Sequence, residues 1–311
     1  MTCPVCDSPR GFEMVENGGK STLYRCGECD VQFWYPVDEP DKRWYEQDIY
    51  YSMVYSVRNY LIPESFHKKY QLFLKNGHVG EGRLLDIGCG TGKFAAKCRD
   101  VGFDVVAIDF NRNSIEAARR NWQLENIHHI SLEEYRDRYP GDRFKVITFF
   151  EVLEHQAKAR AFLEKIRTML VPRGYIALSV PNRDRWRLLP PMNDEPPNHL
   201  TRWNRKSLAN LLTQCGFDIV EISEIPFTVQ SARQVLSGRL NALKNKVLFW
   251  GVKRATGKEG SDKRGEGRHL FHALFYIWRT VAMPPALVIC AYARLFSKKD
   301  SSIYCLAKSV E

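Results

Sequence analysis

The segment Leu84–Phe94, LLDIGCGTGKF, decides the fold. Apolar residues lead to Asp86, and glycines then stand at alternate positions: Gly88, Gly90 and Gly92. A buried strand that ends in an acid and turns through glycines lets backbone N–H groups approach a ligand, which is typical of cofactor turns in α/β proteins. The dinucleotide fingerprint requires glycine where Lys93 stands, and a Walker loop requires Ser or Thr at Phe94, so the segment fits neither pattern.

Around this turn, short apolar runs alternate with amphipathic stretches. This alternation predicts a mostly parallel, doubly wound α/β sheet with helices on both faces. The expected strands are Arg83–Asp86, Asp104–Asp109, Ile127–Ile130, Lys145–Phe150, Gly174–Val180, Phe217–Ser223 and Ile303–Ser309. The expected helices are Glu64–Lys75, Thr91–Val101, Ser114–Asn121, Ala157–Leu170 (ending near Pro172) and Ser207–Cys215.

An acid, Asp109, stands at the end of the second expected strand. A carboxylate at that position can accept both hydroxyls of a ribose. Phe110 follows it, and its ring is suited to lie against an adenine. The alternative is that Asp109 only caps the helix Ser114–Asn121. Because Asp86 and the glycines precede it, the ligand-binding interpretation is favoured.

Five segments in this order are similar to successive motifs of class I methyltransferases that use S-adenosylmethionine (SAM). They are LLDIGCGTGKF, VVAIDFN, ITFFEVLEH, LVPRGYIALSVPN and NHLTRWNRKSLANLLTQCGF, and they resemble most the bacterial branch that includes ubiquinone-type O-methyltransferases. The resemblance implies a seven-stranded Rossmann-like sheet whose last strand is antiparallel to its neighbours. It also implies that SAM contacts Asp86, Gly88, Cys89, Gly90, Gly92, Asp109, Phe110, Leu132, Glu133 and Glu151.

Nine cysteines in a chain without an evident secretory signal favour a reducing compartment. Four of them form two C-x2-C pairs near the N-terminus: Cys3, Cys6, Cys26 and Cys29. Four thiolates from two tight turns suit a tetrahedral structural zinc ion, so we expect a zinc ribbon over residues 1–36. Its charges nearly cancel, which disfavours phosphate binding and favours a packing or substrate-positioning role. Residues 37–80 are expected to form an aromatic linker against the next domain and a helix.

The E-x-x-E-H sequence after the fourth strand brings Glu151, Glu154 and His155 together. Such a cluster shifts its own pKa values unless a cation lies among its members. The pattern resembles ubiquinone-type and small-RNA 2′-O-methyltransferases, which implies ligands for a divalent ion (Mg²⁺ or Mn²⁺), with His199 as a further one. Two alternatives remain open: His155 or His199 is a general base or orients the substrate, or the acids simply solvate a helix N-terminus.

The segment Ala232–Lys299 carries 14 lysines and arginines against three acids, which accounts for the whole net charge of +10. We therefore expect residues 232–300 to be a basic, apolar helical insertion with an anionic partner, such as a membrane surface, nucleic acid or charged glycan. Arg279 and the Pro284–Pro285 pair argue against a membrane-spanning helix in Leu270–Phe296. A lid, a dimer interface and a helix pair resting on a membrane remain open.

The combined prediction is an enzyme, a SAM-dependent methyltransferase whose catalytic core comprises residues 81–231 and 301–311. Its expected acceptor is a hydroxyl on a small molecule, glycan or lipid-linked intermediate. The alternatives are an RNA methyltransferase, suggested by the ribbon, the basic insertion and the E-x-x-E-H pattern, and a non-catalytic SAM-binding regulator. We expect a cytoplasmic protein, with peripheral contact at the inner face of the membrane left open. The sequence does not indicate the oligomeric state.

Overall fold

The computed structural model describes residues 1–37, 64–76, 81–185, 194–226, 287–288, 291–292 and 302–310. The chain separates into two compact units, one of residues 1–62, 66–225 and 300–311, the other of residues 63–65 and 226–299. Most of the second unit, including nearly all of the predicted insertion 232–300, lies outside the described residues, as does most of the predicted linker. None of the helices in the described part is long and apolar enough to cross a membrane.

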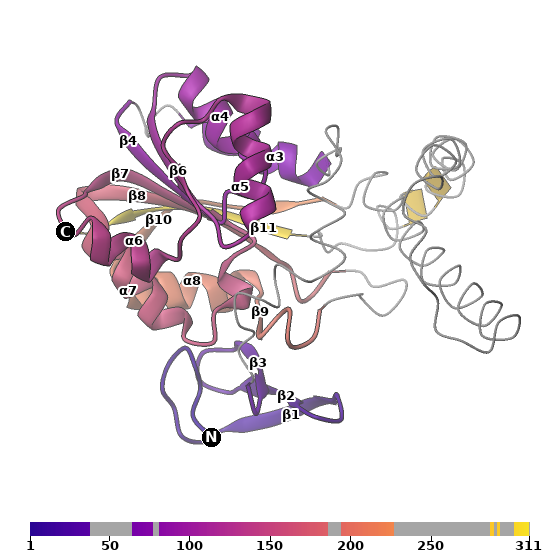
Figure 1. Cartoon of the computed structure of the whole chain (residues 1–311). Helices are drawn as coiled ribbons and strands as arrows, with labels where there is room; N and C mark the ends of the chain where they lie inside the picture. The colour runs from indigo at the N-terminus through magenta and orange to yellow at the C-terminus, as the bar shows by residue number, and fades with distance from the viewer. Residues whose placement is uncertain are drawn as a thin grey trace, which may run out of the picture. The chain divides into compact units, whose positions relative to one another are not determined.

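A seven-stranded sheet forms the centre of the first unit (Figure 1). Its order is β10-β11-β8-β7-β4-β5-β6. The strands are β4 (Arg83–Ile87), β5 (Asp104–Ile108), β6 (Ile127–His128), β7 (Phe144–Phe150), β8 (Leu170–Pro181), β10 (Phe217–Ile225) and β11 (Ser302–Ser309). Neighbours from β8 to β6 are parallel, whereas β11 runs antiparallel to both β8 and β10. The predicted seven-stranded α/β sheet and its reversed last strand are confirmed.

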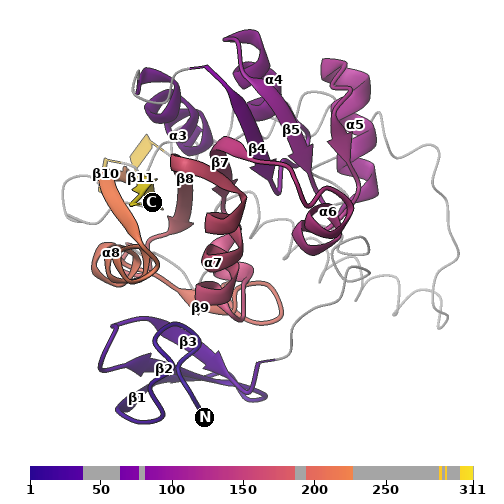
Figure 2. The ribbon, with the colours of Figure 1, turned by 90° about the vertical axis from the view of Figure 1, so that its left-hand side faces the viewer.

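Helices cover both faces of this sheet (Figures 1 and 2). On one face lie α3 (Glu64–Lys75), α4 (Lys93–Asp100) and α5 (Arg112–Trp122). On the other lie α6 (Leu132–Arg138), α7 (Ala159–Met169) and α8 (Arg205–Gln214). Alternate residues of each central strand enter the two cores, so Leu85 packs with one set of helices and Leu84 with the other. This burial on both faces explains why the central strands read as unbroken apolar runs.

Several boundaries differ from the sequence-based expectation, and two of these differences have a clear local cause. The helix before the fifth parallel strand ends at Met169, and β8 begins at once with Leu170. Phe144 pairs with Leu170 and Val146 with Tyr175, so residues 171–174, which include the expected turn, bulge out of a continuing strand. The second difference is at α5, which begins earlier than expected because the side chain of Asn111 caps it by accepting a hydrogen bond from the Ser114 N–H.

A second sheet contains the N-terminal residues. Its strands β1 (Phe12–Asn17), β2 (Thr22–Cys26) and β3 (Gln32–Tyr35) are antiparallel. A fourth strand, β9 (Thr201–Arg202), comes from the segment that precedes α8 and pairs with β3. Figure 2 shows this small sheet next to β9 and α8. Residues 32–35, at the end of the expected ribbon, thus close the ribbon and join it to the core.

Candidate active site

The glycine segment links the carboxyl end of β4 to the N-terminus of α4. Gly88, Gly90 and Gly92 all have positive φ (69°, 53° and 74°), a conformation that disfavours side chains. At Gly92 the reason is also steric, since a Cβ atom there would lie 2.6 Å from the Cβ of Ala118 on α5. The glycines therefore allow a tight turn and close packing of α4 on α5, and α4 begins with no side-chain cap. Its N-terminal N–H groups suit an anionic ligand group.

Two acids flank this turn. Asp86 is buried and accepts a hydrogen bond of 2.7 Å from Thr148 Oγ1 on the neighbouring strand. Burial raises the pKa of Asp86 to about 7. Asp109 follows β5 and accepts one hydrogen bond from the N–H of Gly90 and one from that of Asn111, each 2.8 Å long. Burial raises the pKa of Asp109, although both hydrogen bonds lower it. Asp109 does not cap α5, so the capping alternative is wrong.

The remaining residues predicted to contact SAM occupy different surroundings. Cys89 is buried in the turn, and Phe110 is half-buried next to Asp109 with its carbonyl oxygen 2.5 Å from His129 Nε2. Leu132 is buried in the core at the start of α6. Glu133 beside it is 55% exposed and pairs with Lys165 at 2.6 Å. Contacts of these residues with SAM stay a prediction.

Glu151 begins the E-x-x-E-H segment directly after β7. Its backbone has a positive φ of 58° and is held by a hydrogen bond from its N–H to the Ser179 carbonyl. Its carboxylate pairs with the buried ammonium of Lys69 on α3 and accepts a hydrogen bond of 2.9 Å from Ser179 Oγ. Burial raises the pKa of Glu151, but the Lys69 charge and these hydrogen bonds outweigh it and hold the pKa below its ordinary value. Glu151 is therefore a satisfied anion.

Glu154 lies three residues further on, in the short 3-10 helix η1 (Leu153–His155). Its side chain is 1% exposed, and within the described part of the chain neither carboxylate oxygen has a hydrogen-bond partner. Burial, followed by the charge of Glu151, raises the pKa of Glu154 well above its usual range. A buried carboxylate without donors is costly unless a proton or a cation neutralises it.

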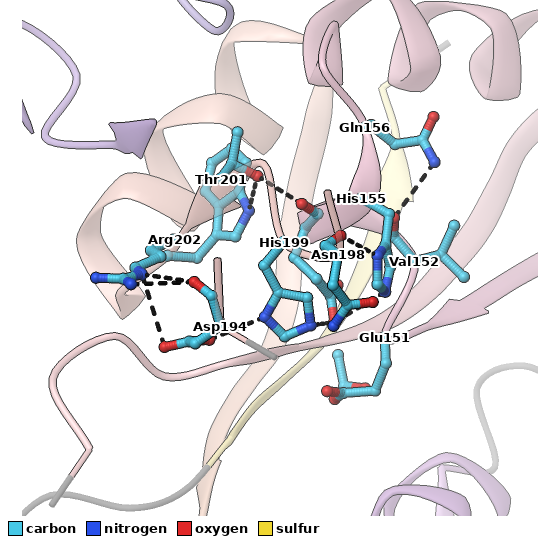
Figure 3. A network of polar contacts seen from close by, with 12 residues as sticks. Glu151, Val152, His155, Gln156, Asp194, Asn198, His199, Thr201 and Arg202 are labelled. Atoms are coloured by element: carbon cyan, nitrogen blue, oxygen red, sulfur yellow. Dashed lines mark hydrogen bonds and ion pairs between the residues drawn. The ribbon is translucent and has the colours of Figure 1, made fainter. Parts of the chain in front are cut away.

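Two histidines face this carboxylate, and Figure 3 shows their rings beside each other, with centroids 5.0 Å apart. His155 Nδ1 lies 2.6 Å from the Asn198 carbonyl oxygen, and His199 Nδ1 lies 2.8 Å from Asp194 Oδ1. Because both partners accept, each Nδ1 donates its proton to that partner, and each Nε2 faces Glu154. Both Nε2 atoms lie 4.0 Å from Glu154 Oε1. Burial, followed by the neighbouring His199, lowers the pKa of His155 to about 3, so the His155 ring stays neutral.

Glu154, His155 and His199 thus each direct one ligand atom to a common point, all within 4.8 Å of one another. Two imidazoles and one carboxylate form a donor set for a divalent metal. Each histidine is oriented through its other nitrogen, as metal-binding histidines generally are. Glu151 does not join this group, because Lys69 and Ser179 take its carboxylate. The structure therefore brings together three of the four predicted metal ligands.

The four N-terminal cysteines form a second such group, with their sulfur atoms all within 4.8 Å of one another. Cys3 Sγ lies 3.6 Å from Cys29 Sγ, and Cys6 Sγ lies 3.6 Å from Cys26 Sγ. The hydrogen bond from Cys29 lowers the pKa of Cys3 to about 5, so one thiolate forms readily. The set fits a structural zinc site.

Sequence reasoning missed the residues that orient these side chains. Lys69, Asp194 and Asn198 come from α3 and from the segment before β9, far from residues 151–155 in the sequence. Their residue types carry no motif of their own. The one available signal is the histidine at 199, because a buried histidine needs a hydrogen-bond acceptor for Nδ1 and acceptors are often found nearby in the chain.

Comparison with known proteins gives consistent matches. Residues 58–222, more than half of the chain, match the family described as "Methyltransferase domain". A ubiquinone biosynthesis O-methyltransferase from Nitrobacter winogradskyi is 36% identical over 107 residues, which are 33% of this chain and 40% of that protein. A probable S-adenosylmethionine-dependent methyltransferase from Mycolicibacterium smegmatis is 28% identical over 157 residues, 50% of this chain and 59% of that one. The matched segments thus span about half the length of these curated relatives.

Among solved structures, a SAM-dependent methyltransferase from Archaeoglobus fulgidus has a similar fold. The TM-score is 0.51 with 18% sequence identity, and the alignment covers 84% of this chain and all of that one. At this identity the likeness concerns the fold alone.

Proposed function

The chain belongs to the class I SAM-dependent methyltransferase family, and from that premise we propose that it methylates a hydroxyl group of a small-molecule acceptor with the help of a divalent ion. The supporting observation is Glu154, whose buried carboxylate has no hydrogen-bond donor in the described part of the chain and faces the Nε2 atoms of two imidazoles. A methyltransferase that only aligned its substrates would not need this arrangement.

The glycine turn and its two acids form the proposed methyl-donor site. SAM supplies the methyl group, which leaves its sulfonium by direct displacement, so the protein needs mainly to align donor and acceptor. The N-terminus of α4 suits the carboxylate of the methionine moiety, and the Asp109 carboxylate suits the ribose hydroxyls. Asp109 accepts hydrogen bonds from the N–H groups of Gly90 and Asn111, which fix the orientation of its carboxylate.

The acceptor half is proposed to hold Mg²⁺ or Mn²⁺ through Glu154, His155 and His199. The residues fit such an ion, because their ligand atoms converge and the buried carboxylate has no other counter-charge at hydrogen-bond distance among the described residues. A divalent ion bound there would lower the pKa of the acceptor hydroxyl. Asp194 and the Asn198 carbonyl keep the two Nε2 atoms directed inward. Burial keeps His155 neutral and able to coordinate.

The proposed acceptor class follows from the relatives that are named ubiquinone biosynthesis O-methyltransferases. We propose a hydroxyl of a small molecule, and treat glycan, lipid-linked and RNA acceptors as outcomes of the test. The experiment incubates the full chain with methyl-labelled SAM and fractions of small metabolites, lipids, glycans and RNA, with and without added Mn²⁺. We expect label in the small-molecule fraction that is lost on chelation and in Glu154→Gln. Equal labelling with and without chelator would overturn the role of the ion.

The N-terminal ribbon is proposed to bind one structural zinc ion through its four cysteines. The convergence of the four sulfur atoms supports this proposal. Elemental analysis of the purified chain should find one zinc per chain, and Cys6→Ser should lose it. Cys215→Ser is the matched control, because Cys215 is buried on α8's C-terminal side and lies outside the cluster. Absence of zinc from the unaltered chain would contradict the proposal.

A further inference from the structure

The ribbon is joined to the segment that carries His199. Strand β3 pairs with β9, with Gln32 opposite Arg202 and Phe33 opposite Thr201. The N–H of Trp34 donates to the Leu200 carbonyl at 3.1 Å, one residue from His199. On its other side, the same segment is tied to η1, because the N–H of Leu200 donates to the Glu154 carbonyl at 2.9 Å. The ribbon and the Glu154 cluster thus hold one short stretch of chain between them.

Arg202 occupies the centre of this junction and is 5% exposed. Its Nη1 donates to Glu16 Oε2 of β1 at 2.9 Å, and its guanidinium lies 5.1 Å from the centroid of the Trp34 ring. Its Nε and Nη2 donate to the Asp194 carbonyl oxygen at 3.1 and 3.0 Å, and Nε lies 3.6 Å from the Asp194 carboxylate. Two ribbon residues, Glu16 and Trp34, therefore hold the guanidinium, and its Nε and Nη2 atoms meet Asp194, as Figure 3 shows.

Asp194 is the residue that orients His199. Its side chain is 2% exposed, and Oδ1 accepts the Nδ1 proton of His199 at 2.8 Å. Its Oδ2 pairs with Arg185 at 2.9 Å. A chain of contacts therefore runs from Glu16 and Trp34 through Arg202 and Asp194 to the imidazole. Outer residues of this kind set the tautomer and the direction of a ligating histidine.

We propose that Arg202 is a positioning residue for His199, and that the ribbon, through Glu16 and Trp34, is part of the support of the active site. This inference rests on the proposed function only in that His199 acts there as a ligand or base. It assigns the ribbon a role that needs no contact with the substrate. A histidine that binds a metal or moves a proton must be held in one orientation by the residues behind it. Without that support, metal affinity and reaction rate both fall.

The first test measures Mn²⁺ affinity of the full chain by titration. Arg202→Met is compared with Arg183→Met, a matched control. The Arg183 side chain is also buried and joins the ribbon to the core, but among the described residues its charge partners are Asp30 and Asp184, not Asp194. We expect Arg202→Met to weaken Mn²⁺ binding by about tenfold or more, and Arg183→Met by less than about threefold. Equal losses in the two variants would overturn the specific role of Arg202.

The second test needs no metal. Long-range ¹H–¹⁵N spectra of the histidine-labelled, metal-free chain report the tautomer of each ring, and His199→Gln assigns the His199 signal. We expect the Nδ1–H tautomer in the unaltered chain and in Arg183→Met, and a mixture of tautomers in Arg202→Met. An unchanged His199 tautomer in Arg202→Met would contradict the proposal. If the unaltered chain bound no Mn²⁺ yet the tautomer changed in Arg202→Met, the metal would be refuted and the positioning role retained.

Glu16→Gln covers the case in which Arg202→Met fails to fold. The Glu16 side chain is 40% exposed, so its replacement leaves the core intact while removing the ribbon's anionic partner of Arg202. We expect a loss of Mn²⁺ affinity of about two- to threefold in the same direction. Unchanged affinity together with an unchanged His199 tautomer would overturn the contribution of the ribbon.

Discussion

The carboxylates beside the glycine turn and the carboxylate of Glu154 differ in one respect. Asp86, Asp109 and Glu151 each receive hydrogen bonds or a counter-charge from their own chain. Glu154, only three residues after Glu151, is more deeply buried and has no donor among the described residues. The carboxylates of the first region are already neutralised or hydrogen-bonded by the protein, whereas a bound cation would stabilise the carboxylate of Glu154. In the proposed function, the first region aligns the methyl donor and the second binds the ion.

The largest loss of folding stability is expected when the ion pair between Lys69 and Glu151 is broken. Glu151→Gln leaves the Lys69 ammonium, 1% exposed, without its anion, and removing one partner of a buried ion pair is costly. We expect the free energy of unfolding of the metal-free chain to fall by about 3 kcal/mol in denaturant titrations. A change below about 1 kcal/mol would mean that Lys69 is satisfied without Glu151.

The next largest loss of stability is expected from disturbing the packing of the glycine turn on α5. In Gly92→Ala the new methyl group would meet Ala118 Cβ at 2.6 Å, and the residue would keep a positive φ. Ala118 has no flexible end that can move away, so α5 itself must shift. We expect a loss of about 2 kcal/mol and weaker SAM binding by calorimetry. Gly141→Ala is the control, since nothing lies within 4 Å of its added Cβ; equal losses in both would refute the steric argument.

The pH dependence of stability tests Asp86. Burial raises its pKa to about 7 in the folded chain, whereas the ordinary value is 3.8. The folded state therefore binds more protons than the unfolded state between these values, and Asp86 contributes stability at low pH that is lost as the pH rises toward 7. Relative to Asp86→Asn, the unaltered chain should lose about 1 kcal/mol per pH unit across this window. Parallel pH profiles of the two proteins would contradict the assignment.

The smallest expected effect is a gain in folding stability, not a loss. Glu154→Gln removes a buried group that has no donor in the described residues and that lies near the charge of Glu151. We expect the metal-free variant to be more stable at pH 8 by about 1 kcal/mol in the same titrations. Destabilisation of the kind expected for Glu151→Gln would show that Glu154 has a structural partner, and the contrast between the two acids would disappear.

The glycine turn and the alternating strands were predictable because their signals are local. Positive φ at Gly88 and burial of Leu84 and Leu85 on opposite faces follow from residue type and period. The E-x-x-E-H cluster was also recognisable, as was His199. The sequence did not indicate that Glu151 forms an ion pair while Glu154 stays without a donor, because that difference depends on Lys69, which comes from another helix.

The joining of the ribbon to the core was likewise hidden in the sequence. Strand β9 has two residues, Thr201 and Arg202, which are too few for a periodic pattern. Its partner β3 reads from the sequence only as an aromatic stretch at the end of the ribbon, since Phe33, Trp34 and Tyr35 precede a proline. Long-range pairings of this kind are set by tertiary packing, and no neighbouring residue in the sequence announces them.

Binding of Mn²⁺ to the purified chain, followed by electron spin echo spectroscopy, tests the central claim most directly. The account predicts one Mn²⁺ site per chain that shows two imidazole nitrogens, with one nitrogen lost in His199→Gln. It also predicts that Glu154→Gln weakens binding by about 100-fold, whereas Glu151→Gln changes it by less than about threefold. A chain that binds no Mn²⁺ beyond its cysteine site, or binds it equally well after Glu154→Gln, would contradict the account.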